Sequence, residues 1–386
     1  MKIDDKTSHN SPSLRFPEFT GEWERCVLGD VLEFSNTRIN SSELNSGNYV
    51  STENILQNFQ GIVKARSIPE DTNVMAFSCG NILLSNIRPY LKKVWKATFN
   101  GGCSSDVFVL QANSNIDADY LHYVVANDKF IGFVMNGAKG VKMPRGDKNQ
   151  MKTYSMSLPS IKEQRKISRF LSFLDERIAV QSRLIEDLKK LRCAIVEKMF
   201  KQSKANGRLG DFIEQVSVRN KNGLYSNVLS VSNKQGFVKQ SEQFEDRTVA
   251  SEDTSNYKIV KRNNFAYNPA RINVGSIARL TKFDVGIVSP MYVCFRTKAS
   301  IIPEYMEAFF TSQQFFYEMM KRLEGSVRLC LSYEGLCNIP VYIPDMNKQI
   351  AMGQNISLIL SKIGLEIEYL GRLHQQKQYL LRKMFI

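Results

Sequence analysis

The chain has few of the residues and motifs that usually form an active site or a metal centre. It contains three histidines among 386 residues, and none of them has the spacing of a metal-binding pair. Neither the phosphate-binding loop G-x-x-x-x-G-K-[ST] nor the dinucleotide motif G-x-G-x-x-G occurs. The nearest match to the N-P-P-[YF] tetrad of adenine methyltransferases is Asn268-Pro269-Ala270-Arg271, which lacks the second proline and the aromatic residue. These absences argue against an enzyme with its own nucleotide or metal site.

Paired cysteines and long apolar runs are also absent. The seven cysteines form no C-x-x-C pair, and an odd number favours free thiols in a reducing compartment over a disulfide framework. Residues 1–13 are polar and lack the apolar core of a signal peptide, and no apolar run is long enough to span a bilayer. The sequence therefore predicts a cytoplasmic protein.

The most informative feature that is present is an internal repeat. The segment Leu158-Pro159-Ser160 and the later Gln164 return 185 residues on (Pro159 to Pro344) as Ile343-Pro344-Asp345 and Gln349. Each copy opens a long helix-like stretch that ends in Lys-Met-Phe, and a Leu-Gly-Asp motif recurs upstream. The repeat predicts two copies of a domain-plus-helix unit about a pseudo-twofold axis, which is also the symmetry of duplex DNA.

Both helix-like stretches have apolar residues spaced by three and four, the pattern of a helix–helix seam. Residues 161–202 contain neither glycine nor proline, and Ser160 with Glu163 predicts a capping box at their start. Asp345 is the corresponding cap of the second helix. Only the polar stretch 201–208 separates the first helix from the second domain, so the second helix must run back along the first. We therefore expect an antiparallel pair with a domain at each end.

The same arrangement makes two finer predictions. It places the chain ends close together, with Phe385 near Phe19. Polar residues interrupt the seam at equivalent positions, and antiparallel pairing predicts that Arg192 faces Glu366 and Gln181 faces Lys377. The alternative is that these side chains extend into solvent.

The expected fold class is α+β: two similar α+β domains joined by two long antiparallel helices. Amphipathic helices are predicted at Tyr120–Met135 and Tyr305–Leu323, and strands at Val107–Leu110 and Met291–Phe295. The predicted boundaries are 14–158 and 208–343 for the domains, and 159–202 and 344–386 for the helices.

The charge balance indicates a nucleic-acid partner. There are 52 Lys and Arg residues against 38 Asp and Glu, which gives a net charge of +14 and a pI near 9.3. The hydrophobic content of 43% is sufficient for globular cores.

Along nearly its whole length the chain resembles the specificity (S) subunits of type I restriction-modification systems. The order and duplication of several motifs carry the resemblance more than any single one. These motifs are Leu14-Arg15-Phe16-Pro17-Glu18-Phe19, Trp23, Leu28-Gly29, and the turn from Leu158-Pro159 into Glu163-Gln164.

The resemblance implies a DNA sequence-recognition subunit without catalysis of its own. In this family two target recognition domains each read one half of a bipartite asymmetric site in double-stranded DNA. The helices set the spacing and dock two modification (methyltransferase) subunits, and restriction subunits join through the complex. The resemblance also implies that S-adenosylmethionine, ATP and Mg²⁺ bind partner subunits and not this chain. The alternative is a stand-alone DNA-binding nuclease or methyltransferase with an unrecognised active site.

Candidate DNA contacts follow from the chemistry of base edges and phosphates, which favours Arg, Lys, Asn, Gln and Ser on loops held by a rigid framework. Three pairs of segments, one in each copy, fit this description: 85–93 with 267–273, 139–148 with 325–328, and 38–40 with 219–221. For any single residue, an ordinary solvated turn explains the pattern about as well. The candidates are Arg38, Ser85, Asn86, Arg88, Tyr90, Lys92, Lys93, Lys139, Lys142, Arg145, Arg219, Asn268, Arg271, Asn273 and Arg328.

Overall fold

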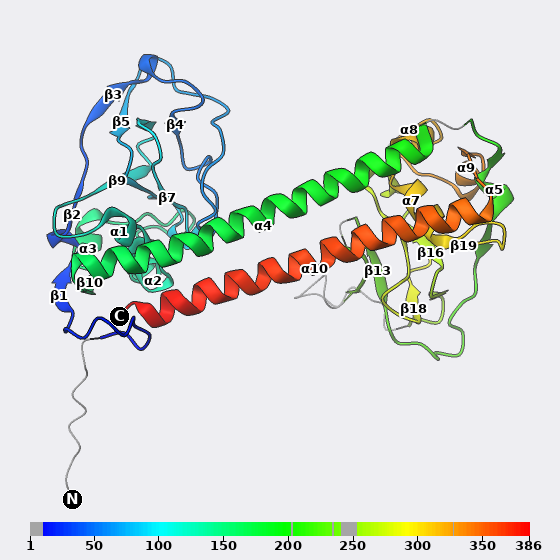
Figure 1. Cartoon of the computed structure of the whole chain (residues 1–386). Coiled ribbons are helices and arrows are strands. Elements are labelled where there is room, and N and C mark those ends of the chain that lie inside the picture. Colours follow the sequence, from blue (N-terminus) through cyan, green and yellow to red (C-terminus); the bar gives the residue numbers. More distant parts are fainter. Residues whose placement is uncertain (1–10, 202–203, 234, 241–252, 327) are drawn as a thin grey trace, which may run out of the picture. The chain divides into compact units, whose positions relative to one another are not determined.

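The structure is a computed structural model that describes residues 11–201, 204–233, 235–240, 253–326 and 328–386. The chain divides into two compact units (Figure 1). Unit 1 comprises the chain through Val180 together with Tyr369–Ile386, and unit 2 comprises Gln181–Glu368. Both units combine helices and strands, which confirms the α+β class. No helix in the described ranges is long and apolar enough to cross a membrane.

Unit 1 is built around a four-stranded antiparallel sheet in the order β2-β9-β6-β7. Its central strands are apolar on both faces and almost wholly buried, as expected of strands covered on both sides. A second sheet has the order β3-β5-β8-β4, and β1 pairs with β10. The strands are β1 (Glu24–Val27), β2 (Leu32–Phe34), β3 (Arg38–Asn40), β4 (Tyr49–Val50), β5 (Asn73–Phe77), β6 (Ile82–Ser85), β7 (Val94–Lys96), β8 (Gly101–Cys103), β9 (Val107–Ala112) and β10 (Ser155–Leu158). The short helices are η1 (Leu28–Asp30), η2 (Ser41–Glu43), η3 (Pro89–Leu91), α1 (Ala118–Val125), α2 (Asp128–Asn136) and α3 (Lys148–Lys152).

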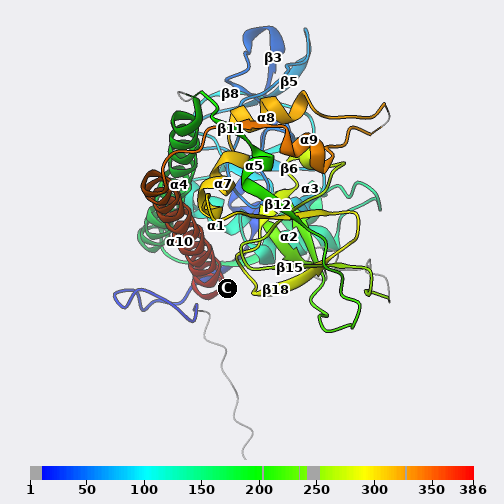
Figure 2. The same ribbon diagram turned by 90° about the vertical axis from the view of Figure 1, so that its right-hand side faces the viewer.

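Unit 2 repeats this topology. Its four-stranded sheet has the order β12-β19-β16-β17, which is the chain order of the main sheet of unit 1, and β15 pairs with β18 (Figure 2). The repeat found in the sequence is therefore a repeat of structure. The strands are β11 (Gly207–Arg208), β12 (Ile213–Val216), β13 (Leu229–Ser232), β14 (Gly236–Lys239), β15 (Lys258–Lys261), β16 (Phe265–Tyr267), β17 (Ile277–Arg279), β18 (Val285–Val288), β19 (Val293–Thr297) and β20 (Pro340–Val341). The short helices are α5 (Leu209–Phe212), η4 (Ile272–Val274), α7 (Pro303–Phe310), α8 (Gln313–Met320) and α9 (Tyr333–Cys337).

The segments predicted as amphipathic helices are helical, but each is divided into two helices by a capping side chain. The side chain of Asn127 accepts a hydrogen bond from Lys129 N and starts α2 as a separate helix after α1. Ser312 likewise accepts from Phe315 N between α7 and α8. Asn and Ser are favoured at this position because they satisfy amides that have no partner within the helix.

The two long helices are α4 (Ile161–Lys201) and α10 (Met346–Met384). The predicted last residue of the first helix, Gln202, lies outside the described residues. The apolar seam is buried as predicted, and its most buried members are at most 9% exposed: Ile167, Leu171, Leu174 and Ile185 of α4, and Ile356, Ile363, Leu373, Leu380 and Met384 of α10.

Within each unit the two helices run antiparallel, as predicted. In unit 1, Arg177 binds Tyr369 and Asp175 binds Lys377. Residue numbers therefore fall along α4 as they rise along α10, which is the pattern of an antiparallel pair. In unit 2, Gln181 binds Glu366, while Val196 and Phe200 share a core with Ile356.

The pairing predicted for the polar residues of the seam is wrong. The side-chain amide of Gln181 donates to the Glu366 carbonyl at 3.2 Å and to its carboxylate, which also binds Lys362. Lys377 binds Asp175 at 2.5 Å. Gln181 and Glu366 are equivalent positions of the repeat, so the midpoint of the antiparallel pairing lies at these residues. The predicted pairing requires a midpoint between Gln181 and Arg192.

The caps of the long helices differ between the units. Asp345 accepts from Lys348 N at 3.0 Å, as predicted. Ser160 accepts from Glu163 N at 3.4 Å, but the Glu163 carboxylate does not complete a capping box. It forms a two-point ion pair with Arg15, with nitrogen–oxygen distances of 2.7 and 2.8 Å. This contact joins the N-terminal segment to the start of α4.

The first described residues of the chain lie beside the end of α10 in unit 1, as expected from the repeat. Leu14 N donates to the carbonyl of Lys383 at 3.0 Å. Two residues further, just beyond α10, the ring of Phe385 stacks on Tyr120 with a centroid distance of 5.1 Å. The N-terminal segment therefore contacts the end of α10 and the start of α4.

A buried glutamine at the start of each long helix explains why this residue recurs. Gln164 donates to the carbonyl of Pro159 at 2.9 Å and accepts from Asp117 N, at the start of α1, at 2.8 Å. Gln349 makes the same contacts with Pro344 and Ile302, at 2.9 and 3.0 Å. Both glutamines are 1% exposed. Each one ties a long helix to the first helix of its own domain.

We predict that Gln164→Ala lowers the local stability of unit 1 by about 2 to 4 kcal/mol, because it leaves a buried amide and a buried carbonyl without partners. Hydrogen exchange of the α1 amides measures this free energy of opening. The exposed Gln376→Ala is the control and should leave it unchanged. Similar exchange in the two variants would contradict the role given to Gln164.

Candidate nucleic-acid interface

The first candidate segment follows β6 in unit 1, and hydrogen bonds fix its backbone conformation. Ser85 is 1% exposed, and its hydroxyl donates to the carbonyl two residues on at 3.0 Å. Arg88 and Lys92, which flank η3, have left-handed backbone conformations with φ of 52° and 54°. Residues other than glycine rarely adopt this conformation. Ser85 thus supports the turn, while Arg88 and the 47% exposed Tyr90 are accessible.

The second candidate segment, residues 139–145, forms a hairpin beside the first. Lys139 and Arg145 exchange two backbone hydrogen bonds of 3.0 and 2.9 Å. Arg88 N donates to Pro144 O at 2.8 Å, and Gly146 N donates to Asn86 O at 3.0 Å. The structure thus brings the two segments together, and we refer to them as the 86–93/139–145 surface.

Ion pairs hold most of the cations of this surface. Lys139 binds Asp147 at 3.2 Å, Arg145 binds Asp106 at 3.0 Å, and Lys92 binds Asp128 at 2.7 Å. The Lys93 ammonium donates to a main-chain carbonyl, and burial lowers its pKa. Among the described residues, the side chains of Arg88 and Lys142 have no such partner. These two residues are therefore the best placed to contact a ligand.

Unit 2 has the same loop-and-hairpin arrangement. Asn268 is 8% exposed, and its side chain accepts from Ala270 N at 3.0 Å, so it supports the turn that presents the exposed Arg271. Glu324 and Cys330 exchange hydrogen bonds of 2.9 and 2.8 Å and close the hairpin. Leu331 N donates to the carbonyl of Pro269 at 3.1 Å, which joins the hairpin to the loop. Asn273 is half-buried within η4.

The tip of the unit 2 hairpin carries the exposed Arg328. Its neighbour Val327 lies outside the described residues. The third pair of candidates is placed elsewhere in each domain. Arg38 is exposed on β3, in the second sheet of unit 1. Arg219 donates to the side chain of Asn256 at 2.9 Å.

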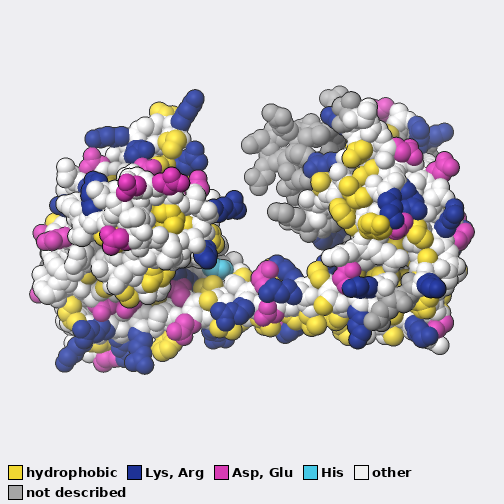
Figure 3. Space-filling model, turned by 90° about the horizontal axis from the view of Figure 1, so that it is seen from above, with side chains coloured by type: hydrophobic (Ala, Val, Ile, Leu, Met, Phe, Trp, Pro, Cys, Tyr) yellow, Lys and Arg dark blue, Asp and Glu magenta, His cyan; other side chains and the backbone are white. Residues whose placement is uncertain are grey.

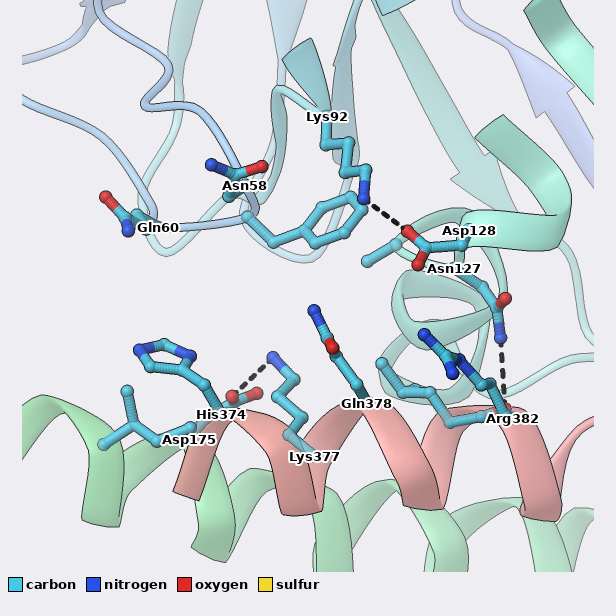
Figure 4. Close-up of a pocket in the computed structure, with 14 residues that line it drawn as sticks. Asn58, Gln60, Lys92, Asn127, Asp128, Asp175, His374, Lys377, Gln378 and Arg382 are labelled. Carbon is cyan, nitrogen blue, oxygen red and sulfur yellow. Dashed lines mark hydrogen bonds and ion pairs between the residues drawn. The ribbon is translucent and has the colours of Figure 1, made fainter. Parts of the chain in front are cut away.

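The structure adds a group of residues that the sequence prediction missed. A crevice of about 420 Å³ in unit 1 is lined by Asn58, Gln60 and Lys92 on one side and by α10 on the other (Figure 4). The lining residues of α10 include His374, Lys377, Gln378 and Arg382. Three of these residues are spaced by four, which places them on one helical face, so a pattern was present in the sequence.

Charge on the visible surface is mixed. On the face seen in Figure 3, lysine and arginine side chains alternate with acidic ones over both units. No group of three His, Cys, Asp or Glu residues that could hold a metal ion occurs in the part of the chain that the structure describes. The candidate interface is therefore defined by the local geometry of the two loops and hairpins.

The chain has two α+β units of equal topology, each with an arginine-bearing loop braced by a hairpin and each packed on the long helices. Comparison with known proteins identifies the class. Residues 20–190 match the family model of the type I restriction modification DNA specificity domain. The match covers less than half of the chain, and together with the relatives below it confirms the resemblance to type I specificity subunits.

Two curated relatives are specificity subunits. The chain is 33% identical over 93 residues to the type I restriction enzyme EcoDI specificity subunit of Escherichia coli, a match that covers 24% of this chain and 20% of the relative. It is 26% identical over 200 residues to the MjaVIII specificity subunit of Methanocaldococcus jannaschii, covering 48% and 43% of the two chains. The matches thus span less than half the length of either relative.

Solved structures extend the similarity of fold to almost the whole chain. The type I S subunit of M. genitalium superposes with a TM-score of 0.61 at 17% identity, over 97% of this chain and 99% of that one. A chain from a structure of a type I R-M system gives a TM-score of 0.56 at 16% identity, over 94% and 97%. At these identities the comparison establishes the fold alone.

The hairpin of unit 2 requires a glycine at position 325. Gly325 has a φ of +113°, and a Cβ added there would lie 2.4 Å from the carbonyl oxygen of Arg328. We predict that Gly325→Ala opens this hairpin at a cost of about 1 to 3 kcal/mol. Faster hydrogen exchange of the Cys330 amide measures the opening.

The control is Gly364→Ala within α10, where an added Cβ meets nothing within 4 Å. This substitution should stabilise the helix by about 1 kcal/mol. Unchanged exchange at Cys330 in Gly325→Ala would show that the hairpin geometry does not depend on this glycine.

Proposed function

We propose that this chain is the DNA sequence-recognition subunit of a type I restriction-modification complex. The observation that carries the proposal is the duplicated loop-and-hairpin surface, which presents Arg88 in unit 1 and Arg271 in unit 2. Arginine is the side chain that most often reads a base, through two hydrogen bonds to guanine in the major groove. Each domain, over residues 14–158 and 208–343, contacts one half of a bipartite, asymmetric site.

The partners proposed for the chain are double-stranded DNA, two modification subunits and, through the complex, restriction subunits. The long helices, residues 159–202 and 344–386, set the spacing between the half-sites and dock the modification subunits. S-adenosylmethionine, ATP and Mg²⁺ belong to those partners. In this proposal the chain itself neither methylates nor cuts DNA, and the support for this is its similarity to specificity subunits.

Mapping of methylated adenines across the genome of cells that express the complex tests this function. We predict that replacing residues 24–150 with the domain of another family member changes one half of the methylated site and leaves the other half intact. The matched control replaces the corresponding part of the second domain and should change the opposite half. A change of both halves by one exchange would contradict the modular reading of DNA. Methyl transfer by the purified chain alone would instead favour a stand-alone methyltransferase.

At the level of single residues, we predict that Arg88→Ala relaxes specificity at one half-site by about 1 to 3 kcal/mol, because one base loses its two hydrogen bonds. Arg271→Ala should do the same at the other half-site. Competition between duplexes that differ at single positions measures the loss. Lys190→Ala is the control, since this exposed residue of α4 pairs with Asp187. A uniform loss across all sequences would identify Arg88 as a phosphate contact.

A further inference from the structure

The crevice in unit 1 has more hydrogen-bond donors and positive charge than its acidic residues can satisfy. Its two carboxylates, Asp128 and Asp175, are each engaged by a lysine, at 2.7 and 2.5 Å (Figure 4). Arg382 and Gln378 are exposed on α10, and neither side chain has a partner among the described residues. A ligand that supplies negative charge and acceptor atoms would complete the site.

The wall opposite α10 is held in a rare conformation. Asn58 N donates to Leu91 O and Phe59 N to Lys92 O, both at 3.0 Å. Of the six non-glycine residues with positive φ in the described ranges, four lie in this wall or in the adjoining loop: Asn58, Phe59, Arg88 and Lys92. Conformations of this kind persist where the surrounding structure imposes them, and they cluster at binding sites.

The crevice adjoins the 86–93/139–145 surface at Lys92, which lines the crevice and belongs to that surface. A polymer bound at that surface therefore has a path over Lys92 to the side chains of α10. This adjacency favours a polymer as the ligand over a small molecule, which would bind in the crevice alone.

The equivalent positions of unit 2 carry different side chains. The repeat places Glu197 at the position of Arg382 and Cys193 at the position of Gln378. The Glu197 carboxylate accepts from Gln313 N at 2.8 Å. The neighbouring hollow is lined by Phe200, Phe316, Tyr317 and Met320 together with Glu197, Lys201, Gln313 and Gln314. Among the described residues, the arginine of the unit 1 crevice is thus replaced in unit 2 by an acidic residue.

We propose that the crevice of unit 1 binds a phosphodiester of the DNA backbone beside the half-site that this unit contacts. The inference rests on the proposed function. The phosphate oxygens accept hydrogen bonds from Arg382 and from the amides of Asn58, Gln60 and Gln378. Contacts of this kind fix the register of a protein on DNA without reading sequence. The proposal therefore predicts an affinity effect that is independent of base sequence.

The test measures binding of the full chain to a duplex of random sequence over a range of NaCl concentrations. Each phosphate contact adds about 0.9 to the slope of log K against log salt, so Arg382→Gln should reduce the magnitude of the slope by about one. Arg382→Lys should retain it. The matched control, Lys383→Gln, removes the same charge one residue along α10, outside the crevice lining, and should leave the slope unchanged.

An unchanged slope in Arg382→Gln, or an equal loss in Lys383→Gln, would overturn the phosphate assignment while leaving the proposed function intact. Absence of salt-dependent DNA binding by the wild-type chain would overturn the proposed function and this site with it. Titration with inorganic phosphate distinguishes a free anion from DNA. Phosphate binding that is lost in Arg382→Gln without any change in the DNA slope would show that the site takes the free ion.

Discussion

Each unit depends on one apolar core that combines a domain with both long helices. In unit 1, Leu121 of α1, Leu171 of α4 and Leu380 of α10 belong to a single buried cluster. In unit 2, Phe309 packs with Phe200 of α4 and shares the core with Ile356 of α10. Because the helices are part of the core, a domain cannot turn on its helices without exposing apolar surface, at about 25 cal/mol per Å². Packing against the long helices therefore fixes the position of each domain, and with it the position of the loops that contact DNA in our proposal.

The long helices and the repeat were predictable because their signals are long and periodic. A seam that recurs over about forty residues leaves little doubt about helix type, and the Gln164 and Gln349 motif marks both starts. The errors concern features set by single side chains. The break before α2 depends on one capping residue, Asn127. The partner of Glu163 is Arg15, which is 148 residues away, so local spacing pointed to a capping box instead.

The pairing of Gln181 illustrates a different limit. The sequence identifies the polar positions of the seam, but not the point about which two antiparallel helices pair. That point is decided by packing of apolar side chains along the whole length of both helices. A shift of the midpoint away from Gln181 and Glu366 would give every polar residue a different partner. The candidate site shows a similar limit of sequence reasoning. Residue type alone predicted that Ser85 and Asn268 contact DNA, but both are buried and support the turns that carry Arg88 and Arg271.

Divergence between the two copies is concentrated where side chains leave the core. Contacts between the main sheet and the first helix of each domain are retained, as in the ion pairs of Lys96 with Asp119 and of Arg279 with Glu304 at equivalent positions. The hairpins keep their backbone closure and their glycine, yet their tips differ, with Met143 in one copy where Arg328 stands in the other. A duplicated framework with different exposed residues can present two unlike surfaces from one topology. Because the tips contribute little to either core, they can change without loss of stability, and this freedom is what recognition of an asymmetric site requires.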